Sequence, residues 1–296
     1  MAKIHDYKTY HGLEDLKRIV DEQDPTKSED LMHALHPFRD KEIGGLLQRI
    51  IDRFIKFSKY TTPMEWFTPK KFNTFMEYFK RKITEDKAKD IESKLADFSL
   101  TLPTESNVES LGDFSDTSSI LRLKKPTKDV VKDLTTYGMS NVLNMSFISL
   151  KLLKSYYHRV HCPVDGKIQK ITFVGRDEPF FGDNSLWIVE FDSKYGRVYL
   201  LVVGEKSIQD FDFRLKIGDE VKKFDELGNF DWGSQTVLIF ESEYFRGECL
   251  IQKGERYFVG EGIFADINII SPSDELENGR EGPNPNRTIF TFHRKV

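Results

Sequence analysis

Four short apolar runs in the second half of the chain constrain its fold more than any other feature. They are Ile168–Val174, Leu186–Phe191, Arg197–Val203 and Val237–Phe240, and glycine and aspartate turns divide them. Short runs rich in β-branched and aromatic residues are typical of strands, and turn-rich connections favour antiparallel neighbours. The sequence therefore predicts a compact antiparallel sheet with hairpins.

The first half of the chain has helical patterns instead. Between Gly44 and Tyr60, apolar residues recur at helical spacing, with Arg49, Arg53 and Lys56 between them. One interpretation is a helix in a membrane interface whose basic side chains meet lipid phosphate. The other is a helix packed on its own domain or on a partner subunit, which is the more common role of amphipathic helices.

Further elements follow from composition and periodicity. Lys71–Ile83 is expected to form a helix with an aromatic face, and Lys128–Leu143 a second helix. Ser110–Ser119 is rich in turn residues and is expected to be a loop. Ile120–Leu123 and the apolar run Met145–Leu153 are expected to be strands. The predicted fold class is α+β, with N-terminal helices followed by an antiparallel, β-rich body with short hairpins.

Composition bounds the kind of protein. The 296 residues contain 44 basic and 48 acidic side chains, a net charge of -4, which gives no global attraction to nucleic acid. Two cysteines, Cys162 and Cys249, are too few for a disulfide scaffold and suit a reducing cytoplasm at least as well as a secreted setting. No window is apolar enough to span a membrane. We therefore expect a cytoplasmic protein, with peripheral membrane contact left open.

A Gly-Ser pair stands immediately before the last of the four apolar runs. Gly233 has no side chain to obstruct a strained backbone, so a tight turn here would press the Ser234 hydroxyl against the preceding carbonyl. A self-cleaving peptide bond needs that geometry. Taken alone, however, Gly-Ser is an ordinary turn sequence.

A second segment, Tyr156–Ile168, makes the pattern specific. It reads Tyr-Tyr-His-Arg-Val-His-Cys-Pro-Val-Asp-Gly-Lys-Ile, and Gly218–Ser234 follows about fifty residues later. Together the two segments resemble the phosphatidylserine decarboxylase family. The residues that match are Tyr157, His158, Arg159, His161, Pro163, Gly166, Gly218, Val221, Lys222, Glu226, Leu227, Gly228, Phe230, Gly233 and Ser234. With the aromatic segment at Phe72–Ile83, the resemblance spans roughly residues 63–265.

This resemblance implies a specific chemistry. Cleavage of the bond between Gly233 and Ser234 would convert Ser234 into a pyruvoyl group, and the chain would become an α and a β chain. His161 would be the base that takes the Ser234 proton, and His158 would serve decarboxylation. The pyruvoyl ketone would condense with a substrate amine and take up the electrons released with carbon dioxide, so no external cofactor is implied.

The resemblance also marks a departure at Glu105. The segment Leu100–Ser106 is similar to a family segment with aspartate where Glu105 stands, and in the family that acid orients the histidine. A glutamate keeps the charge and adds one methylene, which shifts the carboxylate. The other interpretation makes Glu105 a solvated loop residue. If Glu105 has no role, Asp165 is the nearest carboxylate in the histidine segment.

The resemblance predicts residues 1–62 as a helical extension and residues 63–296 as the catalytic domain. The expected partners are a phospholipid or amino-acid substrate and the protein's own cleaved chains, with a homodimer left open and nucleic acid excluded. No metal is expected, because His158 and His161 have no third ligand at the usual spacing.

Three alternatives remain open at this point. The first is a decarboxylase of a free aromatic amino acid. The second is a family member that does not mature and acts as a binding module, since Glu105 replaces aspartate. The third is a serine hydrolase with Ser234 as an ordinary nucleophile, which the absence of a Gly-x-Ser-x-Gly segment disfavours.

Overall fold

The computed structural model describes residues 12–22, 31, 34–56, 62–68, 71–115, 127–175, 185–204, 211–231, 233–245 and 249–266. The chain divides into two compact units, one of residues 1–84 with 154–156 and one of residues 85–153 with 157–296. These units are bounded differently from the predicted domains. The predicted strand at Ile120–Leu123 and the tail after Ser271 lie outside the described residues.

The helices and strands of the first unit are short. Their bounds are α1 Leu13–Glu22, α3 Gly45–Lys56, α4 Phe75–Phe79, β1 Phe67–Thr68 and β2 Lys82–Ile83. The apolar face of α3 is buried, and so is Arg53, which is 5% exposed. Its Nη1 donates to the carbonyl oxygens of Ile19 and Val20 at 2.7 and 3.1 Å, satisfying carbonyls near the end of α1. The interpretation of Arg53 as a lipid-facing residue is therefore wrong, and α3 packs within its own unit.

The predicted helix over Lys71–Ile83 is shorter than expected for a local reason. Thr74 caps α4, since its hydroxyl accepts from the amide of Glu77 at 3.1 Å while Glu77 accepts from the amide of Asn73 at 2.7 Å. The helix ends at Phe79, and the guanidinium of Arg81 is buried, donating to the carbonyl of Ser155 at 2.7 Å. That bond ties residues 154–156 to the first unit.

The second unit is built on β-structure. Its elements are α5 Glu85–Glu92, β3 Phe98–Thr101, β4 Ser106–Asp113, α6 Thr127–Thr136, β5 Met145–Lys151, β6 Arg159–His161, β7 Gly166–Val174, β8 Leu186–Ser193, β9 Gly196–Gly204, β10 Phe211–Phe213, β11 Glu220–Val221, β12 Glu226–Phe230, β13 Gly233–Glu241, β14 Arg256–Tyr257 and β15 Gly262–Ala265. Together with the helices of the first unit, they confirm the predicted α+β class with an antiparallel, β-rich body.

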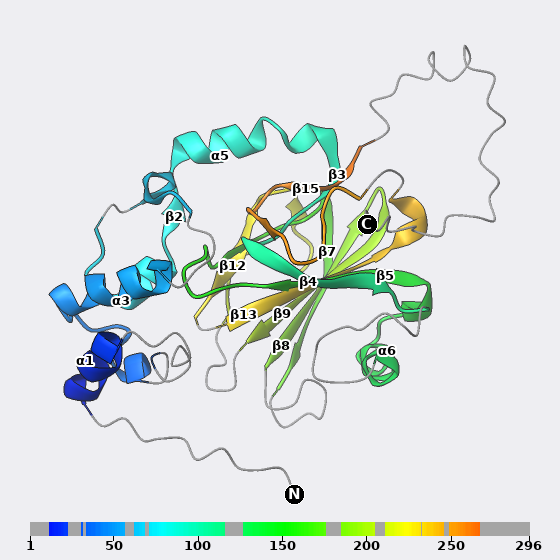
Figure 1. The fold of residues 1–296 in the computed structure, drawn as a ribbon. Helices are drawn as coiled ribbons and strands as arrows, with labels where there is room; N and C mark the ends of the chain where they lie inside the picture. The colour runs from blue at the N-terminus through cyan, green and yellow to red at the C-terminus, as the bar shows by residue number, and fades with distance from the viewer. Residues whose placement is uncertain are drawn as a thin grey trace, which may run out of the picture. The chain divides into compact units, whose positions relative to one another are not determined.

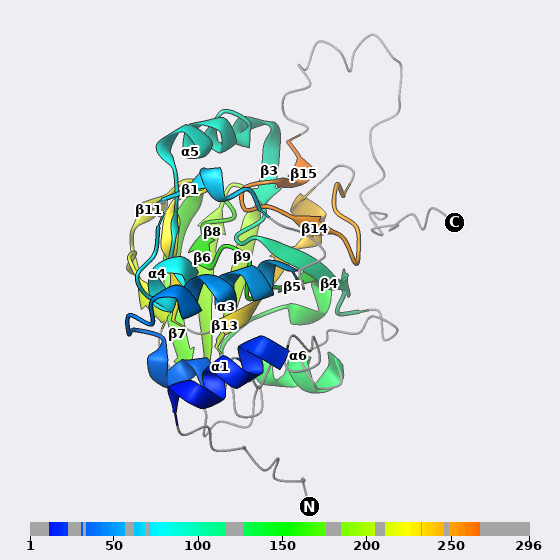
Figure 2. The same ribbon diagram turned by 60° about the vertical axis from the view of Figure 1, so that its left-hand side comes forward.

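Eight of the described strands form one antiparallel sheet in the order β11-β7-β8-β9-β13-β5-β4-β14. A three-stranded sheet, β10-β12-β6, and the pair β15-β3 complete the unit. The four predicted apolar runs are β7, β8, β9 and β13, and all lie in the large sheet. Figure 2 shows β14 beside β4 at one edge.

Both faces of the large sheet are covered, which explains why its central strands are almost continuously apolar. On one face, Ile239 belongs to a core cluster that includes Val130 and Leu134 of α6. On the other face, the ring of Phe240 meets that of Phe264 in β15, with centroids 5.5 Å apart. Figure 1 shows α6 and the pair β3 and β15 on opposite sides of the sheet.

Two further sequence predictions for this unit are corrected. Residues Ser110–Asp113 belong to β4 rather than to a loop, because alternate residues of β4 are buried and the strand pairs with β5. Helix α6 ends at Thr136 and not near Leu143, since Gly138 has a φ of 90° and terminates it. The amide of Met139 donates to the carbonyl of Leu134 at 3.1 Å, as in a Schellman motif.

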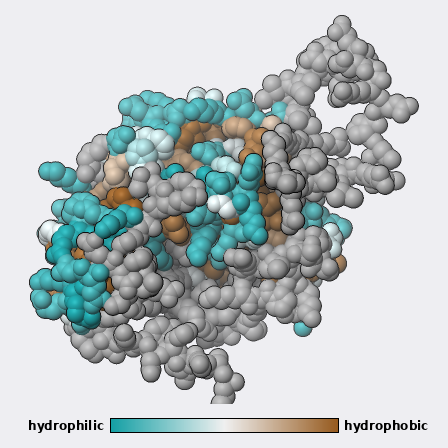
Figure 3. All heavy atoms as spheres, viewed as in Figure 1, coloured by the Kyte–Doolittle hydropathy of each residue, from teal (hydrophilic) through white to brown (hydrophobic). Residues whose placement is uncertain are grey.

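The surface of the described residues is mixed. On the face in Figure 3, hydrophobic residues show between hydrophilic ones. The large apolar side chains that are exposed are Leu143, Phe173, Ile217, Tyr244 and Leu250. Within the described part of the chain, no helix combines the length and the hydropathy needed to cross a bilayer.

Candidate active site

The two histidines of the predicted site lie at the two ends of the short strand β6. His158 lies in irregular chain just before it, and His161 is its last residue. Both are buried, at 0% and 5% exposed. Since residues three apart in a continuous strand point to opposite faces, the irregular position of His158 removes that constraint.

Both ring nitrogens of His161 have a hydrogen-bond partner. Nδ1 lies 2.6 Å from the carbonyl oxygen of Phe224, and Nε2 lies 3.0 Å from the hydroxyl of Tyr157. A carbonyl can only accept, so Nδ1 carries the proton and Nε2 accepts from the tyrosine. The ring nitrogen that carries no proton, and that can therefore take one up, is Nε2, through its bond to the Tyr157 hydroxyl.

Burial lowers the pKa of His161 to about 4, and the hydrogen bond to the Phe224 carbonyl opposes that shift. The charged groups around the imidazole are Glu226, Asp225 and Arg159, and the two carboxylates raise the pKa while the guanidinium lowers it. Arg159 itself pairs with Glu226. The imidazole is consequently neutral near pH 7, as a general base must be.

Glu105 is fully buried and holds two groups of the site. Its Oε1 pairs with Arg256, whose Nε lies 3.0 Å away, and its Oε2 accepts from the main-chain amide of Tyr157 at 2.8 Å. The interpretation of Glu105 as a solvated loop residue is therefore wrong. Glu105 does not bond to the imidazole of His161, because the two ring nitrogens are bonded to Tyr157 and Phe224. Glu105 is linked to His161 only indirectly, since it bonds to the amide of Tyr157.

The Gly-Ser pair lies inside β13 rather than in a turn before it. Gly233 pairs with Gly204, and Gln235 pairs with Val203. The two paired residues are adjacent on β9, whereas one extra residue separates them on β13. This is a β-bulge with residue 234 as the extra residue. The expected tight turn is thus replaced by an irregularity within a strand. The side chain of Ser234 lies outside the part of the chain that the structure describes.

One loop connects the histidines with the strand that carries the Gly-Ser pair. The carbonyl of Pro103 accepts from the amide of His161 at 2.8 Å. The hydroxyl of Thr104 lies 3.2 Å from that of Thr236, two residues after Ser234. The carbonyl of His158 also accepts from the amide of Phe230 at 3.2 Å, shortly before the pair. These bonds link the chain segments that carry the predicted residues, which are widely separated in sequence.

Three residues of the site were missed from the sequence. Tyr157 was matched to the family segment, but no role as the partner of His161 was assigned to it from the sequence. Arg256 and Phe224 have no local signal, since their roles depend on strands brought together by the fold. Asp165, the alternative acid, instead accepts from the amide of Lys223 at 2.7 Å.

A model of the family described as phosphatidylserine decarboxylase matches residues 72–265 of this chain. The chain belongs to the phosphatidylserine decarboxylase family. The family predicted from the histidine and Gly-Ser segments is thereby confirmed, and all the predicted site residues fall within the matched range.

Individual relatives agree with this family. A phosphatidylserine decarboxylase proenzyme from Vibrio campbellii is 26% identical over 258 residues, which is 74% of this chain and 88% of that protein. Proenzyme 2 of Komagataella phaffii is 27% identical over 218 residues, 66% of this chain but only 21% of the yeast protein. The Bacillus subtilis proenzyme is 28% identical over 129 residues, 40% of this chain and 49% of the relative. The chain therefore spans about a fifth of the length of the yeast relative and about half of the length of the Bacillus relative.

The environment of Cys162, next to His161, does not suit a nucleophilic cysteine. Its thiol is free and buried, and burial raises its pKa above the usual value. A nucleophilic cysteine requires the thiolate, which this environment disfavours.

Proposed function

We propose that this protein is a phosphatidylserine decarboxylase that matures by cleaving its own chain between Gly233 and Ser234. The observation that carries the proposal is the position of the Pro103–Glu105 loop. Its bonds join His161, through the Pro103 carbonyl, to Thr236 beside the Gly-Ser pair. The relatives' designation as proenzymes supports a precursor that must be processed.

Cleavage would begin with the Ser234 hydroxyl. As its proton leaves, the oxygen attacks the carbonyl carbon of Gly233, and the peptide nitrogen takes up a proton as the C–N bond breaks. The resulting ester loses the α-proton of residue 234 and releases Gly233 as a carboxylate. The dehydroalanine that remains takes up water and releases ammonia, so that residue 234 becomes a pyruvoyl group. The β-bulge supports this reaction, because regular ladder pairing is interrupted at that residue.

His161 is the base for the first step. Because the Tyr157 hydroxyl donates to Nε2 at 3.0 Å, the serine proton reaches the imidazole through that hydroxyl: Tyr157 accepts it and passes its own proton to Nε2. Glu105 acts through Tyr157, because its carboxylate accepts a hydrogen bond from the main-chain amide of Tyr157 at 2.8 Å. It is thus a positioning residue, held in place by Arg256.

The buried environment around the histidines fits a pyruvoyl group at residue 234. When formed, this group supplies an electron sink for the loss of carbon dioxide from an amine substrate. His158 is buried near the strand that leads to residue 234, through its bond to Phe230, and would hold the proton that replaces carbon dioxide. No other residue in the site is assigned to decarboxylation.

The lipid substrate is favoured over a free aromatic amino acid by the relatives' names. The non-maturing binding module is disfavoured by Glu105, which keeps a buried, fully bonded position despite replacing aspartate. A serine hydrolase would not require processing.

The test is intact-mass spectrometry of the purified protein beside the variants Ser234→Ala and His161→Ala. The parent should separate into residues 1–233 and 234–296, with a pyruvoyl mass at the new terminus, while both variants stay uncut. Ser140→Ala, an exposed serine in the same unit, serves as the control and should cleave as the parent does. A parent that stays full-length after long incubation contradicts the proposal.

The substrate is tested separately on the cleaved protein. Carbon dioxide release should occur with phosphatidylserine in mixed vesicles and not with free tryptophan, tyrosine or serine. Release from a free aromatic amino acid alone would favour the other decarboxylase. Release from neither, in a protein that cleaves, would contradict the substrate and leave the maturation intact.

A further inference from the structure

Phe224 has a backbone conformation that its side chain disfavours. Its φ is 73°, and among the described residues Asn141 is the other non-glycine residue with a positive φ. Asparagine tolerates this region, whereas for a bulky residue it is an outlier and is strained. Such strain persists only where the surrounding structure holds it, and it concentrates at functional sites.

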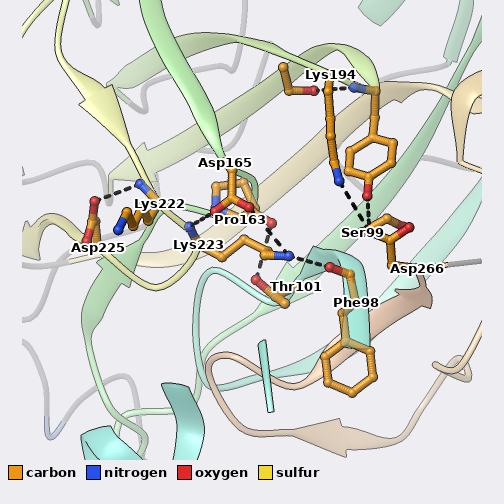
Figure 4. A network of polar contacts seen from close by, with 12 residues as sticks. Phe98, Ser99, Thr101, Pro163, Asp165, Lys194, Lys222, Lys223, Asp225 and Asp266 are labelled. Carbon is orange, nitrogen blue, oxygen red and sulfur yellow. Dashed lines mark hydrogen bonds and ion pairs between the residues drawn. The ribbon is translucent and has the colours of Figure 1, made fainter. Parts of the chain in front are cut away.

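The turn that contains Phe224 is held from several sides, as Figure 4 shows for its neighbours. The main-chain amide of Lys223 donates to the carboxylate of Asp165, and the Nζ of Lys223 donates to the carbonyl of Phe98. The amide of Lys222 donates to the carboxylate of Asp225 at 2.7 Å. Because these bonds fix the residues on both sides, the conformation of Phe224 is imposed on it.

The peptide bonds of Phe224 are also tied directly to the histidine strand. Its amide donates to the carbonyl of Cys162 at 2.9 Å, and the amide of Cys162 donates to the carbonyl of Asp225 at 2.8 Å. The carbonyl of Phe224 is thereby directed at Nδ1 of His161, 2.6 Å away. This bond requires a proton on Nδ1 and so selects the tautomer in which Nε2 accepts.

The ring of Phe224 covers the imidazole at the same time. The two rings are stacked, with centroids 4.4 Å apart and planes inclined by 13°. The ring is also close to Gly260, where a Cβ would lie 3.3 Å from Cδ2 of Phe224. The stacked ring therefore covers one face of the His161 imidazole, and Gly260 leaves room for it.

We propose that Phe224 is a positioning residue for maturation, whose strained backbone sets the tautomer of His161 and whose ring shields the imidazole from solvent. The inference rests on the proposed function, in which His161 is the base. The groups that face the imidazole are the Tyr157 hydroxyl, Arg159 of β6, Glu226 of β12 and Asp225 of the turn. Substitution of Phe224 leaves all four in the sequence, so its effect on the imidazole can be separated from theirs.

The test measures the titration of His161 by NMR in full-length protein that carries Ser234→Ala and therefore stays uncut. Three backgrounds are compared: Phe224 retained, Phe224→Gly and Phe224→Leu. The glycine variant keeps the carbonyl and removes the ring, and should raise the pKa of His161 by about one unit or more toward 6.5, because burial is the main cause of its low value. The leucine variant keeps bulk and should raise it less. Phe245→Leu, a buried aromatic away from His161, is the control and should leave it unchanged.

The same substitutions are then made in the protein that keeps Ser234. The pH below which cleavage slows should rise by the same amount as the pKa of His161. A glycine variant with an unchanged His161 titration overturns the proposal. A shifted titration in a protein whose parent never cleaves supports the role of Phe224 on the imidazole and contradicts the proposed function instead.

Discussion

Arg256 and Glu105 form a buried ion pair between residues 151 positions apart in the chain, with Nε 3.0 Å from Oε1. Glu105 is fully buried, and the Arg256 side chain is 18% exposed. The pair connects β14 to the loop before β4, and through the second carboxylate oxygen it holds the amide of Tyr157.

Arg256→Met should destabilise the protein by roughly 3–5 kcal/mol, because it leaves the Glu105 carboxylate buried without its cation. The measurement is urea unfolding of the Ser234→Ala protein. Adding Glu105→Gln should recover part of the loss, which a double-mutant cycle quantifies. Lys94→Ala, which removes an exposed pair with Asp90, is the control and should leave the midpoint nearly unchanged. Additive losses in the cycle would show that the pair is not coupled.

Tyr157→Phe should slow cleavage by roughly 10²-fold, the usual contribution of a group that transfers a proton. The substitution removes the hydroxyl that bonds to Nε2 of His161. It keeps the main-chain amide that donates a hydrogen bond to Glu105. Precursor half-life on a denaturing gel measures the effect. Tyr156→Phe, at the neighbouring buried tyrosine, serves as control. If the Tyr157 variant matures at the parent rate, the proton does not pass through this hydroxyl.

Stability should fall as the pH is lowered from about 6.5 to about 4, because burial lowers the pKa of His161 to about 4. In that window the unfolded chain binds a proton that the folded protein does not, so lowering the pH favours unfolding. Between pH 7 and pH 5 this contribution is about 2 kcal/mol. Urea midpoints of the Ser234→Ala protein, with and without His161→Gln, isolate it as a difference. Parallel pH profiles for the two proteins would contradict the buried, neutral imidazole.

Arg53→Met should loosen α1 rather than weaken membrane binding. Arg53 bonds to the carbonyls of Ile19 and Val20, so its loss leaves them without that donor. Amide hydrogen exchange should therefore speed up in residues 13–22, whereas sedimentation with anionic vesicles should not change. Lys56→Met, at an exposed position of α3, provides the comparison. Reduced sedimentation with unchanged exchange would restore the lipid-facing interpretation.

Much of the fold follows from local pattern. The apolar runs at β9 and β13 were predictable because strands buried on both faces are almost continuously apolar, and those at β7 and β8 because β-branched and aromatic residues stand between turn signals. Boundaries were less predictable where one residue decides them: Gly138 ends α6, and Thr74 starts α4. Composition windows cannot resolve such single-residue signals.

The sequence by itself determined the family, since Ser234, His158 and His161 stand in segments whose order and spacing identify it, and it predicted these three residues as members of the site. Only the tertiary structure decided their partners. Glu105 meets Tyr157 and Arg256, and His161 meets Phe224, through hydrogen bonds between segments far apart in the chain. No local pattern encodes such contacts, because they depend on which strands pair and in which register. The strained Phe224 is the clearest case: its preferred backbone lies elsewhere, and the bonds around it impose the one observed.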